Sequence, residues 1–154
     1  MKTKQTIIRG ISLGVFLLAS TGCNKAPHTG VFRVTNQSGQ NTFTASLAQK
    51  NGIEQLLLDS NPILTTADFQ EASFVSGTTP AISVKLTPQG TEKFRLATKN
   101  ALNERIAVIL YGKPIIAPTV KAEITNGTFV ISGENTAADE FQALADRLQK
   151  DIAK

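Results

Sequence analysis

Residues 105–118 read RIAVILYGKPIIAP, and the rest of the chain must be arranged around this stretch. Residues 106–110 form an unbroken apolar run of strand length, which is typical of a strand covered on both faces. We therefore expect this run at the centre of a sheet. A Gly-Lys-Pro turn at 112–114 follows, and then a second short apolar piece that ends at Pro118. Because proline cannot donate a ladder hydrogen bond, that piece should lie at a sheet edge or a bend.

The first 22 residues have the features of a bacterial lipoprotein signal peptide. A basic start precedes a short apolar stretch at 11–19, and Gly22 precedes Cys23, the only cysteine. The pattern resembles a lipobox, so we expect cleavage after Gly22 and attachment of lipid to Cys23. The alternative is a plain secretory signal, or a membrane anchor with a structural cysteine. The apolar stretch is shorter than the roughly 20 residues that a membrane-spanning helix needs.

Residues 23–30 have no apolar periodicity and predict a tether that joins the lipid to a folded domain at 31–154. Asn24 stands after the cysteine in place of the aspartate that favours retention in the inner membrane. We therefore expect a periplasm-facing protein, anchored to the outer rather than the inner membrane. Cleavage would leave 132 of the 154 residues, which suits one domain of two packed layers.

The charge of the mature chain argues against a nucleic-acid partner. Three of the 16 basic residues fall in the predicted signal, which leaves 13 against 12 acidic residues. No arginine cluster is interleaved with aromatic residues, so the electrostatic footprint of a nucleic-acid-binding protein is missing. With Cys23 bound to lipid no disulfide can form, and the domain must be held together by its core.

Three strands are predicted in the first third of the folded domain, at 31–35, 42–48 and 53–58. The last two flank Asn51-Gly52, a strong hairpin signal because both residues tolerate positive φ. We expect the three strands to form a meander. A further strand is expected at 81–86, where apolar and polar residues alternate.

Capping signals predict two helices in the middle of the chain. Thr65 and Asp68 have the spacing of a capping box, which predicts a short helix start over residues 65–72. Thr87 is placed to cap a longer helix, with Pro88 at the first position, where the missing N–H costs nothing. The inward face of this helix carries Phe94, Ala97 and Ala101.

The end of the chain predicts a hairpin and a final helix. Strands at 120–125 and 128–132 flank Asn126-Gly127, which we interpret as a two-residue hairpin loop. The same residues begin a glycosylation acceptor pattern, but the turn accounts for them fully. Thr136 should cap the final helix, whose apolar stripe we assign to the core: Phe141, Leu144, Ala145, Leu148 and Ile152.

The chain offers few groups for catalysis. The single histidine, His28, lies in the predicted tether, where nothing could hold it beside a nucleophile. The folded domain lacks the His and Cys ligands of common metal sites and also a glycine-rich phosphate loop. Paired carboxylates remain as a route to a hydrolase, but each pair is explained by a helix start or the end of an element. We therefore expect no enzyme, no metal and no cofactor.

Several motifs follow one another in an order and spacing that resembles one protein family. They are VKLTPQG at 84–90, IAVIL at 106–110, GKPIIAP at 112–118, ITNG at 124–127 and ISG at 131–133, followed by the helical residues 138–148. Together they resemble the periplasmic head subdomain of SecD, an accessory subunit of the bacterial protein-export machinery. The resemblance covers residues 62–150.

The resemblance implies an α+β fold, with a mostly antiparallel sheet packed against two main helices, in agreement with the elements predicted above. It also implies a domain that holds polypeptide as it emerges outside the inner membrane. A fold does not by itself carry a function. The sequence contains none of the membrane helices in which the family's proton-coupled work resides, so proton-driven export is not expected.

The resemblance also implies a candidate interaction surface at the turn and its flank: Tyr111, Gly112, Lys113, Pro114 and Pro118. Lys113 should be exposed at the tip, and Tyr111 stands where the family usually has an aspartate. The alternative is that these residues form a tight turn with a purely structural role.

Three functional hypotheses follow. The first is a non-enzymatic, lipid-anchored envelope module that binds extended polypeptide or an envelope protein partner. The second is a structural envelope lipoprotein without a polypeptide-binding site. The third is a carboxylate-based hydrolase, which requires that folding bring two carboxylates together in a pocket.

Overall fold

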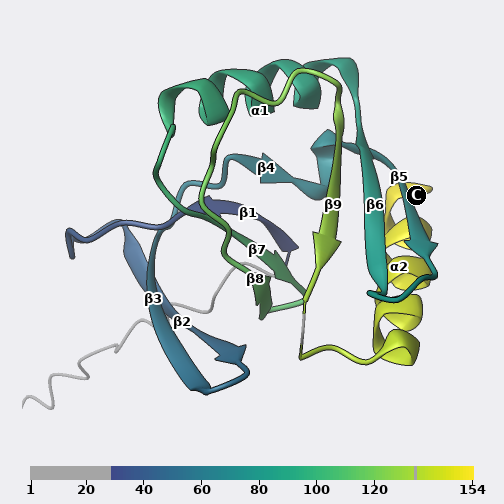
Figure 1. The fold of residues 1–154 in the computed structure, drawn as a ribbon. Helices are drawn as coiled ribbons and strands as arrows, with labels where there is room; N and C mark the ends of the chain where they lie inside the picture. The colour runs from purple at the N-terminus through teal and green to yellow at the C-terminus, as the bar shows by residue number, and fades with distance from the viewer. Residues whose placement is uncertain (1–28, 134) are drawn as a thin grey trace, which may run out of the picture.

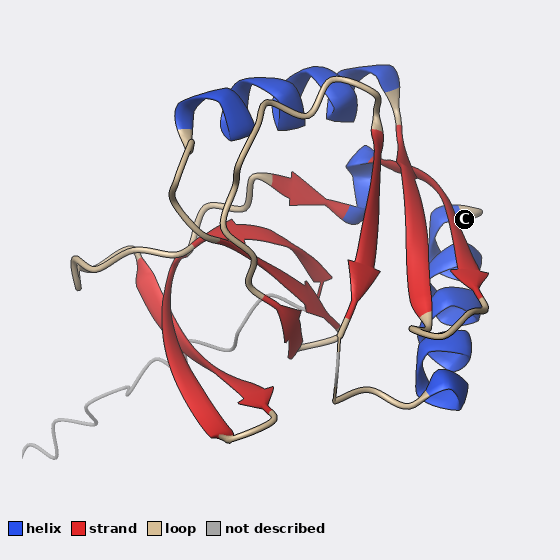
Figure 2. Cartoon of the chain, in the orientation of Figure 1, coloured by secondary structure: helices blue, strands red, loops and turns tan. Residues whose placement is uncertain are grey.

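The computed structural model describes residues 29–133 and 135–154, which form nine strands, two α-helices and one 3₁₀ turn (Figure 1, Figure 2). The strands are β1 (Thr29–Arg33), β2 (Thr42–Gln49), β3 (Gly52–Asp59), β4 (Leu64–Thr65), β5 (Phe69–Val75), β6 (Ala81–Leu86), β7 (Ile106–Leu110), β8 (Lys113–Ile116) and β9 (Thr128–Ser132). The helical elements are η1 (Thr66–Asp68), α1 (Pro88–Asn100) and α2 (Ala138–Ile152). The predicted signal, Cys23 and most of the tether lie outside the described residues.

The strands form three antiparallel sheets. One has the order β4-β1-β7-β8, the second has the order β5-β6-β9, and β2 and β3 form a separate hairpin. In Figure 1, α1 lies across one end of the molecule, and α2 runs alongside β5 and β6. The predicted α+β fold with two main helices is confirmed, although the single expected sheet is divided into three.

β7 is the strand on which both hydrophobic cores are built. All five of its residues are buried, and it lies between β1 and β8. Ile106, Val108 and Leu110 enter the larger core, which the two helices cover, whereas Ala107 and Ile109 enter a smaller core under the β2–β3 hairpin. A strand covered on both faces requires an unbroken apolar sequence, and the prediction for 106–110 is confirmed.

The predicted meander of the first three strands is wrong. β2 and β3 do form a hairpin, with Gln49 opposite Gly52, but β1 pairs with β4 and β7 instead of β2. The cause is the apolar character of both faces of β1: Val31 packs in the larger core and Phe32 in the smaller one. Only a strand in the interior of a sheet can bury both faces in this way.

The predicted helix start at Thr65 contracts to one 3₁₀ turn. The capping interaction is present, since the Thr65 N–H donates to Asp68 Oδ2 over 2.9 Å. The chain then continues as β5, in which the predicted inward residues Phe69 and Ala72 are buried. β5 extends because it pairs with β6 along its whole length, and this tertiary pairing overrides the local helix signal.

α2 follows its predicted stripe, whereas α1 buries Thr98 and leaves the predicted Ala97 half-buried, and only one of the two predicted caps is present. The Thr87 side chain accepts a hydrogen bond from the Gly90 N–H at 3.0 Å, as expected for an N-cap. At α2 the N-cap residue is Ala137, which has no capping side chain, so the prediction of Thr136 as the cap is wrong. Burial of the apolar stripe positions α2 without a cap.

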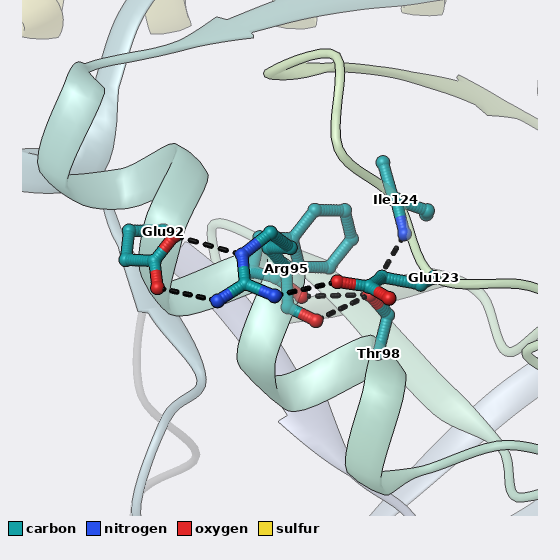
Figure 3. A network of polar contacts seen from close by, with 6 residues as sticks. Glu92, Arg95, Thr98, Glu123 and Ile124 are labelled. Carbon is teal, nitrogen blue, oxygen red and sulfur yellow. Dashed lines mark hydrogen bonds and ion pairs between the residues drawn. The ribbon is translucent and has the colours of Figure 1, made fainter.

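The predicted hairpin around Asn126-Gly127 is also wrong. Residues 117–127 form an irregular crossover segment that rises to α1, and β9 pairs with β6. Figure 3 shows two hydrogen bonds that hold this segment on α1. Arg95 Nη1 donates to Glu123 Oε1 at 2.6 Å, and the Ile124 N–H donates to the buried Thr98 hydroxyl at 3.0 Å. β9 pairs with β6 because Phe129 and Ile131 then complete the larger core.

No helix among the described residues is long and apolar enough to cross a membrane.

Candidate functional site

The candidate turn between β7 and β8 consists of two residues. Leu110 pairs with Lys113, so the loop is Tyr111-Gly112, one position earlier than the predicted Gly-Lys-Pro turn. Tyr111 has φ 52° and Gly112 has φ 81°, the positive values that a primed hairpin turn requires at both positions. Aspartate or asparagine before glycine is the usual choice there, so Tyr111 occupies a demanding backbone position.

Contacts with α2 and β1 hold Tyr111 in that position. Its hydroxyl donates to Asp151 Oδ2 at 2.9 Å, and the guanidinium carbon of Arg147 lies 3.7 Å from the ring centroid. Its backbone N–H donates to Thr29 Oγ1 at 3.0 Å. Burial and the bond to Asp151 raise the pKa of Tyr111 to about 12, so the phenol stays protonated at neutral pH. The side chain is thus engaged within the fold.

The other candidate residues have different environments. Lys113 forms an ion pair with Glu140 of α2, although both side chains remain about half exposed. Pro114 is buried, whereas Gly112 and Pro118 are exposed. The five candidate residues therefore do not form one continuous surface.

Pro118 lies at an open groove that local sequence reasoning missed. The groove runs between the tip of the β2–β3 hairpin, the end of β8 with the start of the crossover segment, and β9. Its lining residues are Leu47, Ala48, Gln49, Lys50, Asn51, Arg105, Ile115, Ile116, Ala117, Pro118, Val130, Ser132, Gly133 and Asn135. No motif could reveal it, because tertiary folding alone brings β2 beside segments that follow far later in the chain.

The groove walls are held together by Arg105. Its Nη2 lies 3.1 Å from Glu54 Oε2 of β3, and its Nε donates to the Ala117 carbonyl at 2.9 Å. The Arg105 hydrogen bonds hold the pKa of Glu54 below its usual range, against the opposing effect of burial. Arg105 is therefore neutralised by Glu54, and Lys50 is the remaining charged side chain among the described residues of the lining.

Several carboxylates of the described residues serve structural contacts. Asp68 is buried and accepts from Lys93 Nζ at 2.7 Å. Burial alone would raise the pKa of Asp68, but the hydrogen bonds from Lys93 and Thr65 outweigh it and lower that pKa. Within residues 29–133 and 135–154, no three His, Cys, Asp or Glu side chains are grouped as metal ligands, and the groove lining contains no carboxylate. His28 and Glu134 lie outside the described residues.

Comparison with known proteins gives one consistent family. Residues 40–150 match the model for the SecDF P1 head subdomain. The chain is 36% identical to the protein translocase subunit SecDF of Thermus thermophilus over 74 residues, which is 47% of the chain and 10% of that protein. It is 40% identical over 76 residues to the protein translocase subunit SecD of Petrotoga mobilis, covering 49% of the chain and 15% of that protein.

A longer match is to the protein translocase subunit SecD of Magnetococcus marinus, 31% identical over 106 residues, or 68% of the chain and 18% of that subunit. The chain thus corresponds to less than a fifth of the length of these three relatives.

Solved structures agree on the fold. A crystal structure of SecDF in a super-membrane-facing form superposes with a TM-score of 0.61 at 23% identity, covering 81% of this chain and 19% of that one. A structure of SecDF, described as a membrane component that enhances protein export, gives a TM-score of 0.58 at 24% identity, covering 79% of this chain and 63% of that one.

Proposed function

Because the chain belongs to the SecDF P1 head subdomain family, we propose that it is a non-enzymatic cell-envelope module that binds extended polypeptide or an envelope protein partner. It is anchored by lipid on Cys23, faces the periplasm, and lies on the outer rather than the inner membrane. The observation that carries the binding role is the open groove beside β9, on a chain whose relatives are protein translocase subunits.

The composition of the groove supports a polypeptide as its ligand. Small and apolar side chains such as Ala117, Pro118 and Val130 form much of the lining, and its Arg105 is paired with Glu54 of β3. Such a surface suits segments that differ in sequence, because apolar contact is non-directional. Of the five candidate residues, Pro118 lines the groove and thereby keeps the role of interaction residue.

Support for a non-enzymatic role comes from the side chains. Two of the carboxylates near helix starts are used in ion pairs: Asp68 pairs with Lys93, and Glu140 pairs with Lys113. A hydrolase would need two carboxylates directed into one pocket.

A structural lipoprotein is the second candidate, favoured by the docking of the Tyr111 turn on α2. A double variant with alanine at Tyr111 and Lys113 distinguishes a binding role of the turn from a purely structural role. If this variant is stable and its envelope phenotype is unchanged, the turn has no binding role, and binding is then tested at the groove.

Site-specific photocrosslinking tests the groove directly. A photoreactive amino acid replaces Val130 in the full chain, which is mixed in detergent with reduced and alkylated α-lactalbumin, a permanently unfolded polypeptide. Leu96, exposed on α1, is the matched control position because its side chain is similarly apolar and accessible. We expect a crosslink from position 130 and none from position 96. Equal labelling at both positions, or none at either, would reject the proposed polypeptide binding at this groove.

A further inference from the structure

β9 presents one edge of its backbone to the groove. It is the last strand of the β5-β6-β9 sheet and pairs only with β6 among the described strands. The Leu86 N–H donates to the Gly127 carbonyl at 2.8 Å, which makes this pair hydrogen-bonded in the antiparallel register. Hydrogen-bonded pairs recur at every second residue, so Phe129 and Ile131 also bond to β6. The backbone groups of Val130 and Ser132 therefore point away from β6.

The groove and this strand edge coincide. Val130 and Ser132 are the two β9 residues that line the groove, and their N–H and carbonyl groups have no protein partner among residues 29–133 and 135–154. The Val130 side chain is 56% exposed. β9 reads Thr-Phe-Val-Ile-Ser, without the charge, proline or bulge that usually protects an exposed edge. An unprotected edge of this kind is a template for another strand.

The neighbouring strand β8 is not available in the same way. Lys113 closes the two-residue turn with Leu110 as a hydrogen-bonded pair, so the backbone of Pro114 faces away from β7. Pro114 has no N–H to donate and its side chain is buried. Of these two neighbouring strands, β9 is therefore the one that can accept an added strand.

The walls of the groove select a single extended segment over a second folded copy. Gly133 lies against β8, where an added Cβ would be 3.3 Å from the Ile115 carbonyl oxygen, and Asn135 Nδ2 donates to the Ala48 carbonyl at 3.0 Å. These contacts close one end of the groove around β9. The edge of β9 therefore lies in a recess between two walls. A free peptide strand can enter this recess more readily than the edge of another sheet can.

Charge adds a preference. Among the described residues of the lining, Lys50 is the charged side chain without an ion pair, because Arg105 is paired with Glu54. It lies in the β2–β3 turn, on the wall opposite β9. An acidic residue in the bound segment would complement it, and a basic residue there would be repelled.

We propose that the groove binds an extended, proline-free polypeptide as an added strand on β9. Backbone groups of the segment pair with Val130 and Ser132, its small or β-branched side chains lie over Ala117 and Pro118, and an acidic residue lies near Lys50. This inference rests on the proposed function and goes beyond it by naming the binding mode and the sequence preference.

Fluorescence anisotropy of labelled peptides, with the full chain in detergent, tests this binding mode. The probe is a short soluble peptide in which valine and serine alternate and one end carries glutamate. Two further peptides are N-methylated on alternate backbone nitrogens, in one register or in the other. Because only one register faces β9, one methylated peptide should bind about tenfold more weakly and the other as well as the parent.

Protein variants give an independent measurement. Val130→Pro removes the N–H that faces the groove and leaves the ladder bonds of Phe129 and Ile131 to β6 in place, so we expect about tenfold weaker binding. Circular dichroism checks its folding. Lys50→Glu, a change in an exposed turn, should reverse the preference between glutamate- and lysine-ended peptides even if the proline variant fails to fold. Leu96→Ala is the control and should bind as the unaltered chain does.

The possible failures are distinguishable. If the parent peptide binds, and neither N-methylation in one register nor Val130→Pro weakens peptide binding, then strand addition is wrong and the proposed polypeptide binding stands. If no peptide and no unfolded polypeptide binds, the proposed function itself is wrong. If sedimentation shows that the chain self-associates and Val130→Pro abolishes this, the edge belongs to a second copy and the inference is overturned.

Discussion

Tyr111 combines an unusual backbone with a half-buried side chain. A positive φ at a bulky residue costs free energy, on the order of 1 kcal/mol, which the surrounding contacts must offset. The bond to Asp151 and the stacking of Arg147 supply these contacts. The turn is thus stabilised by α2, an element that begins 27 residues later in the sequence. Tyrosine at this demanding backbone position therefore has a structural explanation.

The titration of Tyr111 can be followed without interference. It is the single tyrosine and the chain has no tryptophan, so the near-ultraviolet tyrosinate absorbance reports this residue alone. We expect a midpoint at about 12, because burial and then the hydrogen bond to Asp151 raise the pKa from its ordinary value of 10.0. Since the folded pKa is raised, the associated stabilisation is present below the unfolded pKa and is lost as pH rises from 10 through about 12.

Asp151→Ala provides the control for this titration. Removing the carboxylate should move the midpoint down toward 10.0 while the chain remains folded. The denatured chain should titrate at the ordinary value. A folded chain with an unshifted midpoint would mean that Tyr111 is not held against α2.

Among the elements, α1 is placed by close backbone contact with η1. The Asp68 carbonyl accepts from the Thr87 N–H at 2.9 Å, and the Asp68 carboxylate accepts from Lys93 one turn and a half into the helix. Gly90 lies directly beneath: a Cβ there would overlap the Asp68 carbonyl oxygen and lie 2.9 Å from the Asp68 Cβ. Glycine at this position lets the first turn of α1 approach η1.

Replacement of this glycine should reverse the usual effect of alanine in a helix. Gly→Ala in a helix is ordinarily stabilising by about 1 kcal/mol. Gly90→Ala should instead lower the free energy of unfolding by about 1–3 kcal/mol, because the methyl group forces α1 away from Asp68. Urea unfolding of both chains measures the difference.

Gly39→Ala is the matched control for that substitution. No atom lies within 4 Å of the position a Cβ would occupy at Gly39, and its φ is not positive. Its free energy of unfolding should change by less than about 1 kcal/mol. A stabilised Gly90→Ala chain would show that α1 does not approach η1 closely.

At the scale of the molecule, the two cores of the described part of the chain run from residues of β1 to residues of α2. The larger core begins with Val31 and the smaller one with Phe32. The predicted lipid attachment at Cys23 precedes both in the sequence and lies outside the described residues.

Cys23→Ser should therefore release a folded, soluble domain. Cell fractionation is expected to show the variant in the soluble fraction, while circular dichroism and the unfolding midpoint match those of the lipidated chain. An unfolded or degraded variant would mean that the lipid or the tether stabilises the domain. A variant that stays with the membrane would mean that Cys23 is not the anchor.

Sequence alone was enough for features that depend on local patterns. The buried strand at 106–110, the Thr87 cap of α1 and the stripe of α2 were all predicted, because periodicity and capping are encoded within a few neighbouring residues. The family likeness was also visible there, since its motifs keep their order and spacing along the chain.

The pairing of strands was decided only by tertiary structure. β1 joined β7, β9 joined β6, and the expected hairpin at Asn126-Gly127 became a crossover, because the pairings that form are those that bury Phe32 and Ile131. The groove has the same origin, as it joins β2, β8 and β9. A local pattern specifies which faces are apolar, but the partner that covers each face is chosen by the packing of the whole core.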